Sequence, residues 1–302
     1  MVVNNPVHVN EDGLQLNAIE WLETHHRSKA AERERMIRDL HLIRGSSVVD
    51  AGCGPGLWTP LLARAIGAEG RITGVDISPA ALITAQQRLQ GKWYQPIVQY
   101  KQGILEELPV RPGAADVIFS ANVSQYLPDP VSTFTSMGRY LKNGGRLIIK
   151  DIDFGTMRFH NIDTALQAKV FQARERWEGA RVDEGYAFED SWVGSKLAGY
   201  LRNAGYEEVQ ERSYRIVRRY PVPKDFRCYL QGIVEWFVCE GAPYLDPSYC
   251  KQWLEQFKDG RALDKNDFMS EEVEYIVSGK WTQSPSTRGR YFDMHVEMEL
   301  VG

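Results

Sequence analysis

Short apolar runs alternate with segments of helical periodicity along most of this chain, beginning with the run Ser47-Val48-Val49. Such runs of β-branched residues are typical of strands that are buried on both faces. The pattern predicts helices from about Trp58 to Ile66 and near Ala80 to Gln90. It predicts strands at residues 47–51, 72–76, 97–101, 116–120, 146–151, about 208–218 and about 273–280. Strands that alternate with helices indicate an α/β fold, with a doubly wound parallel sheet and right-handed crossovers.

Two further helices are predicted ahead of the first strand. Apolar residues recur at helical spacing over residues 15–43, interrupted by the polar stretch HHRSKAAERER. We expect residues 1–44 to form an N-terminal helical cap and residues 45–302 to form the core. Simple packing against the sheet also explains the amphipathic second helix, so the first helix is the better candidate for a lid.

Two stretches do not fit this core, and we expect both to be lid insertions: residues 154–190 and residues 221–266. The second is rich in aromatic residues, and Tyr229, Trp236 and Phe237 share one face at helical spacing. That face can be the insertion's own buried core. It can also line an apolar or aromatic substrate pocket, because rings supply contact area while a few polar groups set orientation. Both interpretations stay open.

The segment VVDAGCGPG at residues 48–56 carries the clearest chemistry. Asp50 ends a strand, and glycines follow at positions 52, 54 and 56, where glycine permits positive φ and close approach of a ligand. A dinucleotide fingerprint would need a third glycine at position 57, which is leucine in this chain. This difference argues against an NAD-dependent oxidoreductase. A second acid, Asp76, ends the next strand, where a carboxylate can accept both hydroxyls of a ribose.

Further segments extend this observation over residues 30–220 and 267–282. They are GCGPG at 52–56, GVDIS at 74–78, ILEELP at 104–109, ADVIFSANVSQYLPDP at 115–130, LKNGGRLIIKDID at 141–153, LRNAGY at 201–206 and DFMSEEVEYIVSGK at 267–280. In these segments the chain resembles the class I S-adenosylmethionine-dependent methyltransferases, within the small-molecule group that includes quinone-biosynthesis enzymes. The resemblance implies S-adenosyl-L-methionine as the cofactor and methyl transfer in an SN2 reaction.

The resemblance also implies the arrangement of the sheet. It predicts a Rossmann-like seven-stranded sheet in the order 3-2-1-4-5-7-6, with strand seven antiparallel and helices on both faces. The cofactor then lies beyond the carboxyl ends of strands one and four, where the strand order reverses. In the family, leading helices cover it. The residues expected at the cofactor are Asp50, Gly52, Cys53, Gly54, Gly56, Trp58, Asp76, Ile77, Ile104, Leu105, Asn122 and Gln125.

One position departs from the family pattern. Related sequences commonly read G-D-A-x-x-L-P after strand three, whereas this chain reads GILEELP at residues 103–109. The acid that would accept the adenine amino group is missing, and Ile104 offers only an apolar surface to the ring. Either a backbone group or Gln102 accepts that amino group, or cofactor affinity is lower by about 0.5–1.5 kcal/mol, the net value of one hydrogen bond.

The methyl acceptor is expected to be a small organic metabolite with an apolar or aromatic body, in secondary metabolism. The loop after strand four has neither the N/D-P-P-Y/F/W motif of nucleic-acid methylation nor the paired glutamates of arginine methylation. A phenol, carboxylic acid or amine acceptor can also need a base, and the candidates past strand five are His160, Asp151 and Asp153. An ordinary solvated loop histidine explains His160 equally well. The residues expected at the substrate are Tyr126, Tyr229, Trp236 and Phe237, with Gln125 as a further positioning group.

Composition restricts the partners and the location. The formal net charge is -4 and the basic residues are scattered, whereas a nucleic-acid site is normally a basic face. We expect a cytoplasmic protein, because no apolar run approaches a membrane span and residues 1–13 lack a basic-then-apolar signal. A homo-oligomer is possible. The cysteines form no C-x-x-C pair and the acids form no ligand cluster, so we expect no metal. The alternative is a methyltransferase-fold protein that binds the cofactor without methyl transfer, or that catalyses another reaction.

Overall fold

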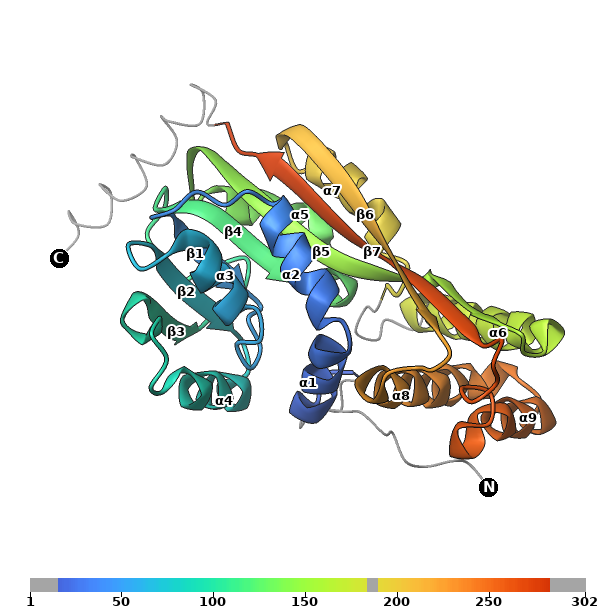
Figure 1. The fold of residues 1–302 in the computed structure, drawn as a ribbon. Coiled ribbons are helices and arrows are strands. Elements are labelled where there is room, and N and C mark those ends of the chain that lie inside the picture. The colour runs from blue at the N-terminus through green and yellow to red at the C-terminus, as the bar shows by residue number, and fades with distance from the viewer. Residues whose placement is uncertain (1–15, 184–189, 283–302) are drawn as a thin grey trace.

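The computed structural model describes residues 16–183 and 190–282, and a seven-stranded sheet lies at the centre of these residues (Figure 1). The strand order is β3-β2-β1-β4-β5-β7-β6, and β7 runs antiparallel to both of its neighbours. Both features confirm the predicted arrangement. The strands are β1 (Ser47–Ala51), β2 (Arg71–Asp76), β3 (Val98–Gln102), β4 (Ala115–Ala121), β5 (Leu141–His160), β6 (Glu207–Arg219) and β7 (Met269–Lys280).

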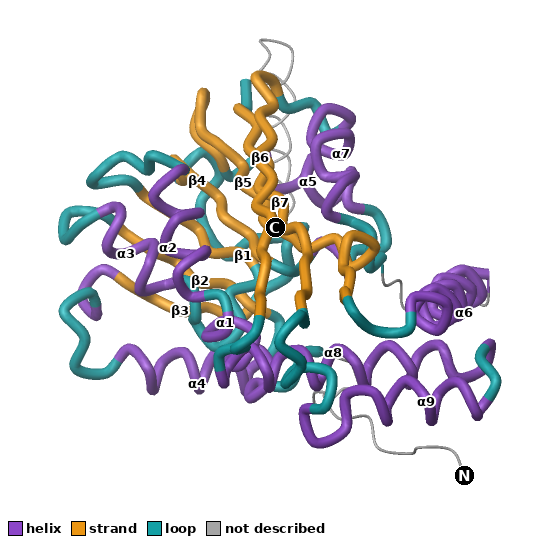
Figure 2. Tube along the Cα trace, turned by 45° about the vertical axis from the view of Figure 1, so that its right-hand side comes forward, coloured by secondary structure: helices purple, strands orange, loops and turns teal. Residues whose placement is uncertain are grey.

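Helices cover both faces of the sheet (Figures 1 and 2). On one face, Met36 and Leu62 share a buried cluster with Phe119 of β4 and Ile148 of β5. On the other face, Phe134 and Leu201 belong to a cluster with other residues of β4 and β5. The helices of the first face are α2 (Ala30–Asp39), α3 (Thr59–Ile66) and α4 (Pro79–Leu89), and those of the second are α5 (Pro130–Gly138) and α7 (Leu197–Asn203).

Local sequence signals explain several of these boundaries. The hydroxyl of Ser78 accepts a hydrogen bond from the Ala81 amide, and Pro79 occupies the first turn of α4. Asp129 caps α5 in the same way. Short 3₁₀ turns join other elements: η1 (Gln95–Ile97), η2 (Ser124–Tyr126), η3 (Gly194–Lys196), η4 (Ala242–Tyr244) and η5 (Lys258–Gly260). The two predicted leading helices are present as α1 (Ile19–Ser28) and α2.

Strand β5 continues well past its predicted end at residue 151, to His160. Its far part pairs with the start of β7, because Arg158 lies opposite Glu271 and His160 lies opposite Met269. An antiparallel partner that continues the ladder keeps these backbone groups hydrogen-bonded. Residues 154–160, which we predicted as the start of an insertion, are therefore strand, and β7 likewise starts before residue 273.

The helices of the two insertions pack together beyond the sheet (Figure 2). They are α6 (Thr164–Asp183), α8 (Lys224–Gly241) and α9 (Pro247–Phe257). Their buried side chains form one cluster with Trp21 of α1 and with Ile152, Phe154 and Phe159 of β5. We call α1, α6, α8 and α9 the cap. None of the helices within residues 16–183 and 190–282 is both long and apolar enough to cross a lipid bilayer.

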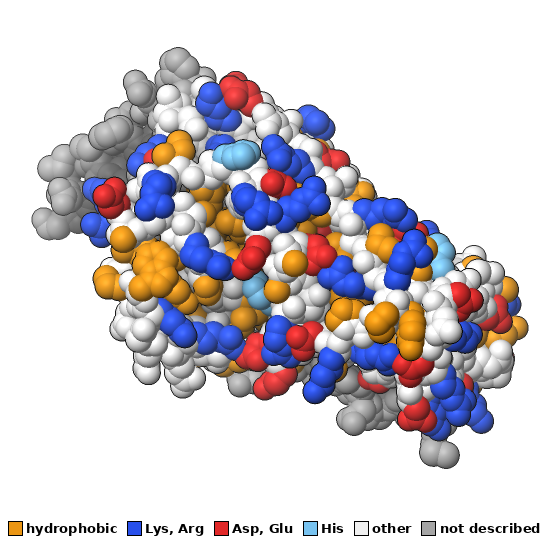
Figure 3. All heavy atoms as spheres, in the orientation of Figure 1, with side chains coloured by type: hydrophobic (Ala, Val, Ile, Leu, Met, Phe, Trp, Pro, Cys, Tyr) orange, Lys and Arg blue, Asp and Glu red, His pale blue; other side chains and the backbone are white. Residues whose placement is uncertain are grey.

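Charged side chains of both signs are interspersed over the face drawn in Figure 3. Several form ion pairs between elements that are distant in sequence. Arg64 of α3 pairs with Glu34 of α2 at 3.1 Å, and Arg218 of β6 pairs with Glu32 of α2 at 2.8 Å. These pairs link α2 to β6 and to α3.

Candidate active site

The glycine loop between β1 and α3 is shaped for close approach. Gly52, Gly54 and Gly56 all have positive φ, at 72°, 51° and 74°. A Cβ at Gly52 would collide with the side chain of Val123, which follows β4. The amides of Gly52 and Cys53 donate to the Val75 carbonyl at 2.8 and 2.9 Å, so β2 holds the loop in place. A side chain at Gly52 would therefore close the space between the loops after β1 and β4.

Asp76 lies at the carboxyl end of β2, beside this loop. Its Oδ2 accepts a hydrogen bond from the Gly54 amide at 2.7 Å, and its Oδ1 accepts from the Ser78 amide at 2.9 Å. Each carboxylate oxygen has a second lone pair. Asp76 can therefore shape the glycine loop and still accept the two hydroxyls of a ribose.

Two buried groups of opposite charge beside the loop have unused hydrogen-bonding atoms. Asp50 accepts a hydrogen bond from Thr59, but its Oδ2 has no partner among the described residues. Burial raises the pKa of Asp50 to about 7, with a smaller contribution from Asp76. Arg33 of α2 contacts His26 through Nη1 at 2.7 Å and lies over the Trp58 ring, yet its Nε and Nη2 have no partner among the described residues. Unused buried atoms of this kind are rare in proteins and suit a ligand with one cationic and one anionic end.

Apolar side chains lie where an adenine ring is expected. Ile77 follows β2 and is 67% exposed, and Ile104 follows β3 and is 45% exposed. Leu105 is half-buried beside them. Gln102 donates from Nε2 to the Ile77 carbonyl at 3.2 Å, which leaves its Oε1 as an acceptor at the same edge. These positions allow the isoleucines to contact a ring and Gln102 to receive its amino group.

The loop after β4 holds Asn122, Gln125 and Tyr126 next to the glycine loop. Asn122 has φ of 59°, and its amide donates to the Lys150 carbonyl at 2.8 Å. Its Oδ1 accepts from Lys150 Nζ at 2.6 Å. Gln125 is buried, and its carbonyl accepts from the Asp190 amide at 2.7 Å. The structure therefore brings the loops after β1, β2 and β4 together, as predicted from the strand order.

The candidate bases of β5 differ in position. Asp151 is fully buried and accepts from the amides of Ser124 at 3.0 Å and Ile152 at 3.1 Å, so it supports the loop after β4. Burial raises its pKa to about 7. Asp153, also buried, accepts from the Gly155 amide at 2.9 Å. Both carboxylates point to the opposite face of β5 from Lys150, because side chains alternate along a strand.

His160 lies apart from this group. It ends β5, and its partner Met269 lies six residues before Tyr275, the partner of Asp151, which corresponds to roughly 20 Å at the usual rise of a strand. Its Nε2 lies 2.9 Å from Oε1 of Glu271, and its side chain is 39% exposed. His160 thus ends a strand and forms a partially exposed pair with Glu271, apart from the glycine loop, so we do not include it in the site proposed below.

The predicted substrate residues of α8 fall into two groups. Trp236 donates from Nε1 to Glu240 at 2.6 Å and lies under the guanidinium of Arg174, 3.7 Å from the ring centroid. Phe237 packs edge-on against Phe154 and Phe171 in the cap core. Tyr229 is also buried, but its hydroxyl donates to Glu272 at 2.6 Å and meets a cluster of charges. The structure therefore places Trp236 and Phe237 in the core of the cap, and Tyr229 beside charged groups.

This charged cluster consists of Lys29, Lys150, Glu272 and Glu274, all essentially without solvent exposure. Lys29 Nζ lies 2.8 Å from Glu272 and 2.9 Å from Glu274, and Lys150 Nζ lies 3.0 Å from Glu274. Lys150 shares a face of the sheet with Asp50, because Asp50 pairs with Phe119, and Phe119 with Ile148, two residues before Lys150. Sequence reasoning missed the cluster. The only available signal was acids at alternating positions of an interior strand, where inward-facing residues are normally apolar.

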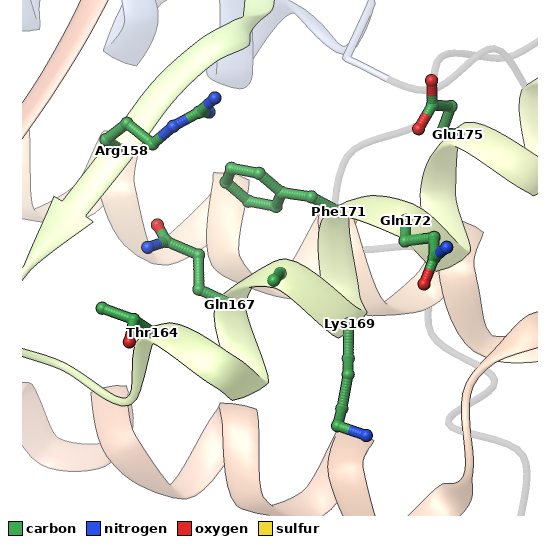
Figure 4. Close-up of a pocket in the computed structure, with 8 residues that line it drawn as sticks. Arg158, Thr164, Gln167, Lys169, Phe171, Gln172 and Glu175 are labelled. Carbon is green, nitrogen blue, oxygen red and sulfur yellow. The ribbon is translucent and has the colours of Figure 1, made fainter.

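A surface pocket of about 600 Å³ lies elsewhere, along α6 (Figure 4). Its lining residues are Arg158, Thr164, Gln167, Ala168, Lys169, Phe171, Gln172 and Glu175. Arg158 comes from β5 and lies over the Phe171 ring at 5.5 Å, while the remaining residues come from α6. None of the predicted site residues lines this pocket.

Comparison with known protein families shows the family to which this chain belongs. The profile of a family described as methyltransferase domain matches residues 43–207, which include the glycine loop and Asp76. The chain belongs to the methyltransferase domain family. This membership confirms the resemblance seen in the sequence. The matched residues end before the cap insertion that carries α8.

Several proteins are similar to this methyltransferase domain. An uncharacterized 37.1 kDa protein in transposon TN4556 of Streptomyces fradiae is 32% identical over 225 residues, which cover 74% of this chain and 61% of that protein. A demethylmenaquinone methyltransferase of Lactiplantibacillus plantarum is 31% identical over 116 residues, covering 38% of this chain and 49% of that enzyme. The chain thus spans less than two thirds of the length of these two relatives. The crystal structure of YcgJ from Bacillus subtilis superposes with a TM-score of 0.52 at 16% identity, covering 86% of this chain and all of YcgJ, which supports the fold.

Proposed function

We propose that this protein transfers a methyl group from S-adenosylmethionine to a small organic molecule with an apolar or aromatic body. The observation that carries the proposal is the pair of unused buried groups beside the glycine loop, Asp50 Oδ2 and the Nε and Nη2 of Arg33. A methionine end has one ammonium and one carboxylate. These two groups complement it, and Asp76 complements the ribose. When bound, the cofactor supplies a methyl group that is already activated by its sulfonium.

The residues of the chain then hold and orient the reactants. Asp76 accepts the ribose hydroxyls, and Ile77 and Ile104 enclose the adenine ring, with Gln102 Oε1 as acceptor for its amino group. Positioning of this kind can lower a barrier by about 7–11 kcal/mol through effective molarity. No covalent help from the protein is required for that contribution.

The cap excludes water from the same place. Leu22 of α1 lies 3.8 Å from the position that a Cβ of Gly54 would occupy, so α1 covers the glycine loop. Glu23 of α1 also forms an ion pair with Arg88 of α4. A cover that closes over a reactive centre strengthens the electrostatic interactions beneath it and prevents side reactions.

The acceptor enters between the covered loop and the cap. Rings border this region, since Trp21 stacks on Tyr229 at 5.5 Å and Trp58 contacts Phe119 at 5.2 Å. Tyr126 follows Gln125 in η2, at the loop after β4. Aromatic walls with a few fixed polar groups suit a small organic molecule rather than a polymer. The buried Asp151 positions this loop through the Ser124 amide.

Calorimetry and a product assay test the proposal in sequence. We expect S-adenosylmethionine and S-adenosylhomocysteine to bind and NADH not to bind. Incubation with methyl-labelled S-adenosylmethionine and fractionated metabolites is then expected to yield S-adenosylhomocysteine and one labelled product, both detected by mass spectrometry. A protein that does not bind S-adenosylmethionine contradicts the whole proposal. A protein that binds it but forms no S-adenosylhomocysteine with any fraction supports the non-transferring alternative.

A further inference from the structure

The charged cluster of Lys29, Lys150, Glu272 and Glu274 contains unused acceptors. Lys29 and Tyr229 contact Oε2 of Glu272, while Lys29 and Lys150 contact Oε1 of Glu274. The other oxygens, Glu272 Oε1 and Glu274 Oε2, are buried and have no partner among the described residues. Each buried polar atom without a partner costs about 1–3 kcal/mol. An anchor for the cap would need only the contacts already made, so these free oxygens call for another explanation.

The cluster also lies next to the cofactor loops. Lys150 forms the last β4–β5 pair, with Ala121, and its ammonium donates to Oδ1 of Asn122 at 2.6 Å. Glu272 and Glu274 are two residues apart on β7, so both point to the same face of the sheet. This is also the face on which Lys150 and Asp50 lie, because Lys150 pairs with Ile276 of β7.

We propose that Glu272, Glu274 and Lys150 form the acceptor subsite, and that it takes an uncharged hydrogen-bond donor, a hydroxyl or a neutral amine, on the methyl acceptor. The inference rests on the function proposed above. A donor of this kind satisfies Glu272 Oε1 and Glu274 Oε2. The cap covers the subsite through Lys29 and Tyr229, so the ligand enters when α1 moves away from the sheet.

The charge of the cluster selects the class of ligand. Lys29 and Lys150 offset Glu272 and Glu274. Arg33 also acts on both glutamates, but in the function proposed above the carboxylate of the bound cofactor offsets its charge, which leaves the cluster neutral as a whole. An anionic head group would place a further negative charge beside two carboxylates. A cationic head group would add an uncompensated charge in a buried site. An uncharged donor avoids both penalties.

Three probes that share a para-ethylphenyl group and differ in their head group test the proposal. They are para-ethylphenol, para-ethylaniline and para-ethylbenzoate, measured by calorimetry on the full chain saturated with S-adenosylhomocysteine. At neutral pH the phenol and the aniline are uncharged donors, and the benzoate is an anion. We expect the phenol or the aniline to bind about tenfold more tightly than the benzoate, as one hydrogen bond to a charged group predicts. Comparison of the phenol with the aniline shows whether the subsite prefers a hydroxyl group or an amine on the methyl acceptor.

Variants on β7 assign this selectivity to the named oxygens. Glu272→Gln and Glu274→Gln are each expected to reduce the preference over benzoate at least severalfold, with unchanged affinity for S-adenosylhomocysteine. Glu271→Gln is the matched control, because Glu271 directly precedes Glu272 on β7, points to the opposite face of the sheet and pairs instead with Arg215 and His160. Unchanged selectivity in the folded glutamine variants overturns the proposal.

The wild-type comparison decides the matter if a glutamine variant does not fold. Equal binding of all three probes, tighter binding of benzoate, or no binding of the phenol and the aniline up to their solubility overturns the acceptor subsite. In each of these cases bound S-adenosylhomocysteine leaves the proposed function intact. Failure of S-adenosylhomocysteine itself to bind contradicts the proposed function instead, so the two failures are distinguishable.

Discussion

The ammonium of Lys29 lies 2.9 Å from the carboxylate of Glu274, and neither side chain is exposed to solvent. The two residues are separated by 245 positions in the sequence. Lys29 stands at the junction of α1 and α2, whereas Glu274 lies in the middle of β7, so this contact joins the N-terminal helices to the sheet. Burial acts to raise the pKa of Glu274, but Lys150 and Lys29 outweigh it and hold the pKa well below its usual range.

Replacement of Lys29 is expected to loosen this junction. Lys29→Met leaves two buried carboxylates with one cation fewer, and removal of one partner from a buried ion pair typically costs about 3–5 kcal/mol. Denaturant unfolding measures the change. Arg64→Met is the matched control, because the Arg64–Glu34 pair is more than half exposed and such pairs contribute little. A stability of Lys29→Met equal to that of the control would show that the buried pair does not hold the cap.

Asp76 is expected to control affinity for the cofactor. Asp76→Ala removes a carboxylate that can accept two ribose hydroxyls, so binding of S-adenosylhomocysteine should weaken by about tenfold or more, which is 1.4 kcal/mol. Asp76→Asn should have a smaller effect, because it keeps one acceptor oxygen. Calorimetry on both variants, with Asp225→Ala as an exposed control, checks the order. An unchanged affinity in folded Asp76→Ala contradicts the assignment.

Arg33 is expected to bind the carboxylate of the methionine end. A hydrogen bond to a charged group contributes about 1.5–3 kcal/mol, so Arg33→Gln should weaken cofactor binding by roughly tenfold to a hundredfold. Arg35→Gln is the control, since Arg35 lies on the same helix with its side chain 68% exposed. Melting temperatures of both variants show whether the fold is retained. Equal affinities in the two variants would assign Arg33 to packing against Trp58.

Cofactor binding is expected to depend on pH through Asp50. Burial raises the pKa of Asp50 to about 7, so the carboxylate that would bind an ammonium forms only as pH rises through about 7. Affinity should therefore increase from pH 6 to pH 8, roughly tenfold per unit below the pKa and little above it. In Asp50→Asn this rise should be absent. An identical pH profile in wild type and variant would exclude Asp50 as the responsible group.

The stability of the unliganded protein should fall as pH rises, whereas its affinity for the cofactor should increase. The folded-state pKa of Asp50 is above its unfolded value, so the folded protein binds the extra proton between about pH 4 and pH 7. The contribution of Asp50 to stability is thus complete below pH 4 and is lost as pH rises through about 7. Asp50→Asn should be more stable than wild type at pH 8 by denaturant unfolding, with a smaller difference at pH 5.

Trp236 and Phe237 provide a test of the cap. Both rings are buried, at 4% and 1% exposure, so truncation to alanine is expected to destabilise the protein by about 3–5 kcal/mol. Affinity for S-adenosylhomocysteine should stay nearly unchanged, because the glycine loop belongs to the core. Tyr244→Ala, which removes a 37% exposed ring of the same insertion, is the control. Normal kinetics in a destabilised Trp236→Ala protein would confine this ring to the cap core, whereas a raised Michaelis constant at full stability would place it at the substrate.

Much of the fold, and the contact between the glycine loop and Asp76, could be predicted because the signals are local. Alternation of apolar runs and helical periodicity specifies the order of strands and helices, and Ser78 and Asp129 begin their helices through bonds to residues three positions away. The spacing of Gly52, Gly54 and Asp76 within one strand-loop-helix-strand unit places them together, since such a unit folds in one way. The sheet order came from the resemblance, which the structure confirms.

The charged cluster depended on tertiary structure. Lys29, between α1 and α2, meets Lys150 of β5 and Glu274 of β7, and no local pattern around any of the three shows that the other two pack against it. Likewise, pairing with the start of β7 extends β5 and carries His160 away from Asp151. Periodicity determines which residues share a face of their own element, but burial and charge pairing depend on which other element packs against that face. The sequence alone therefore determined most of the elements and the glycine loop, while only the packing of α1, β5, β7 and α8 decided which charges are buried together.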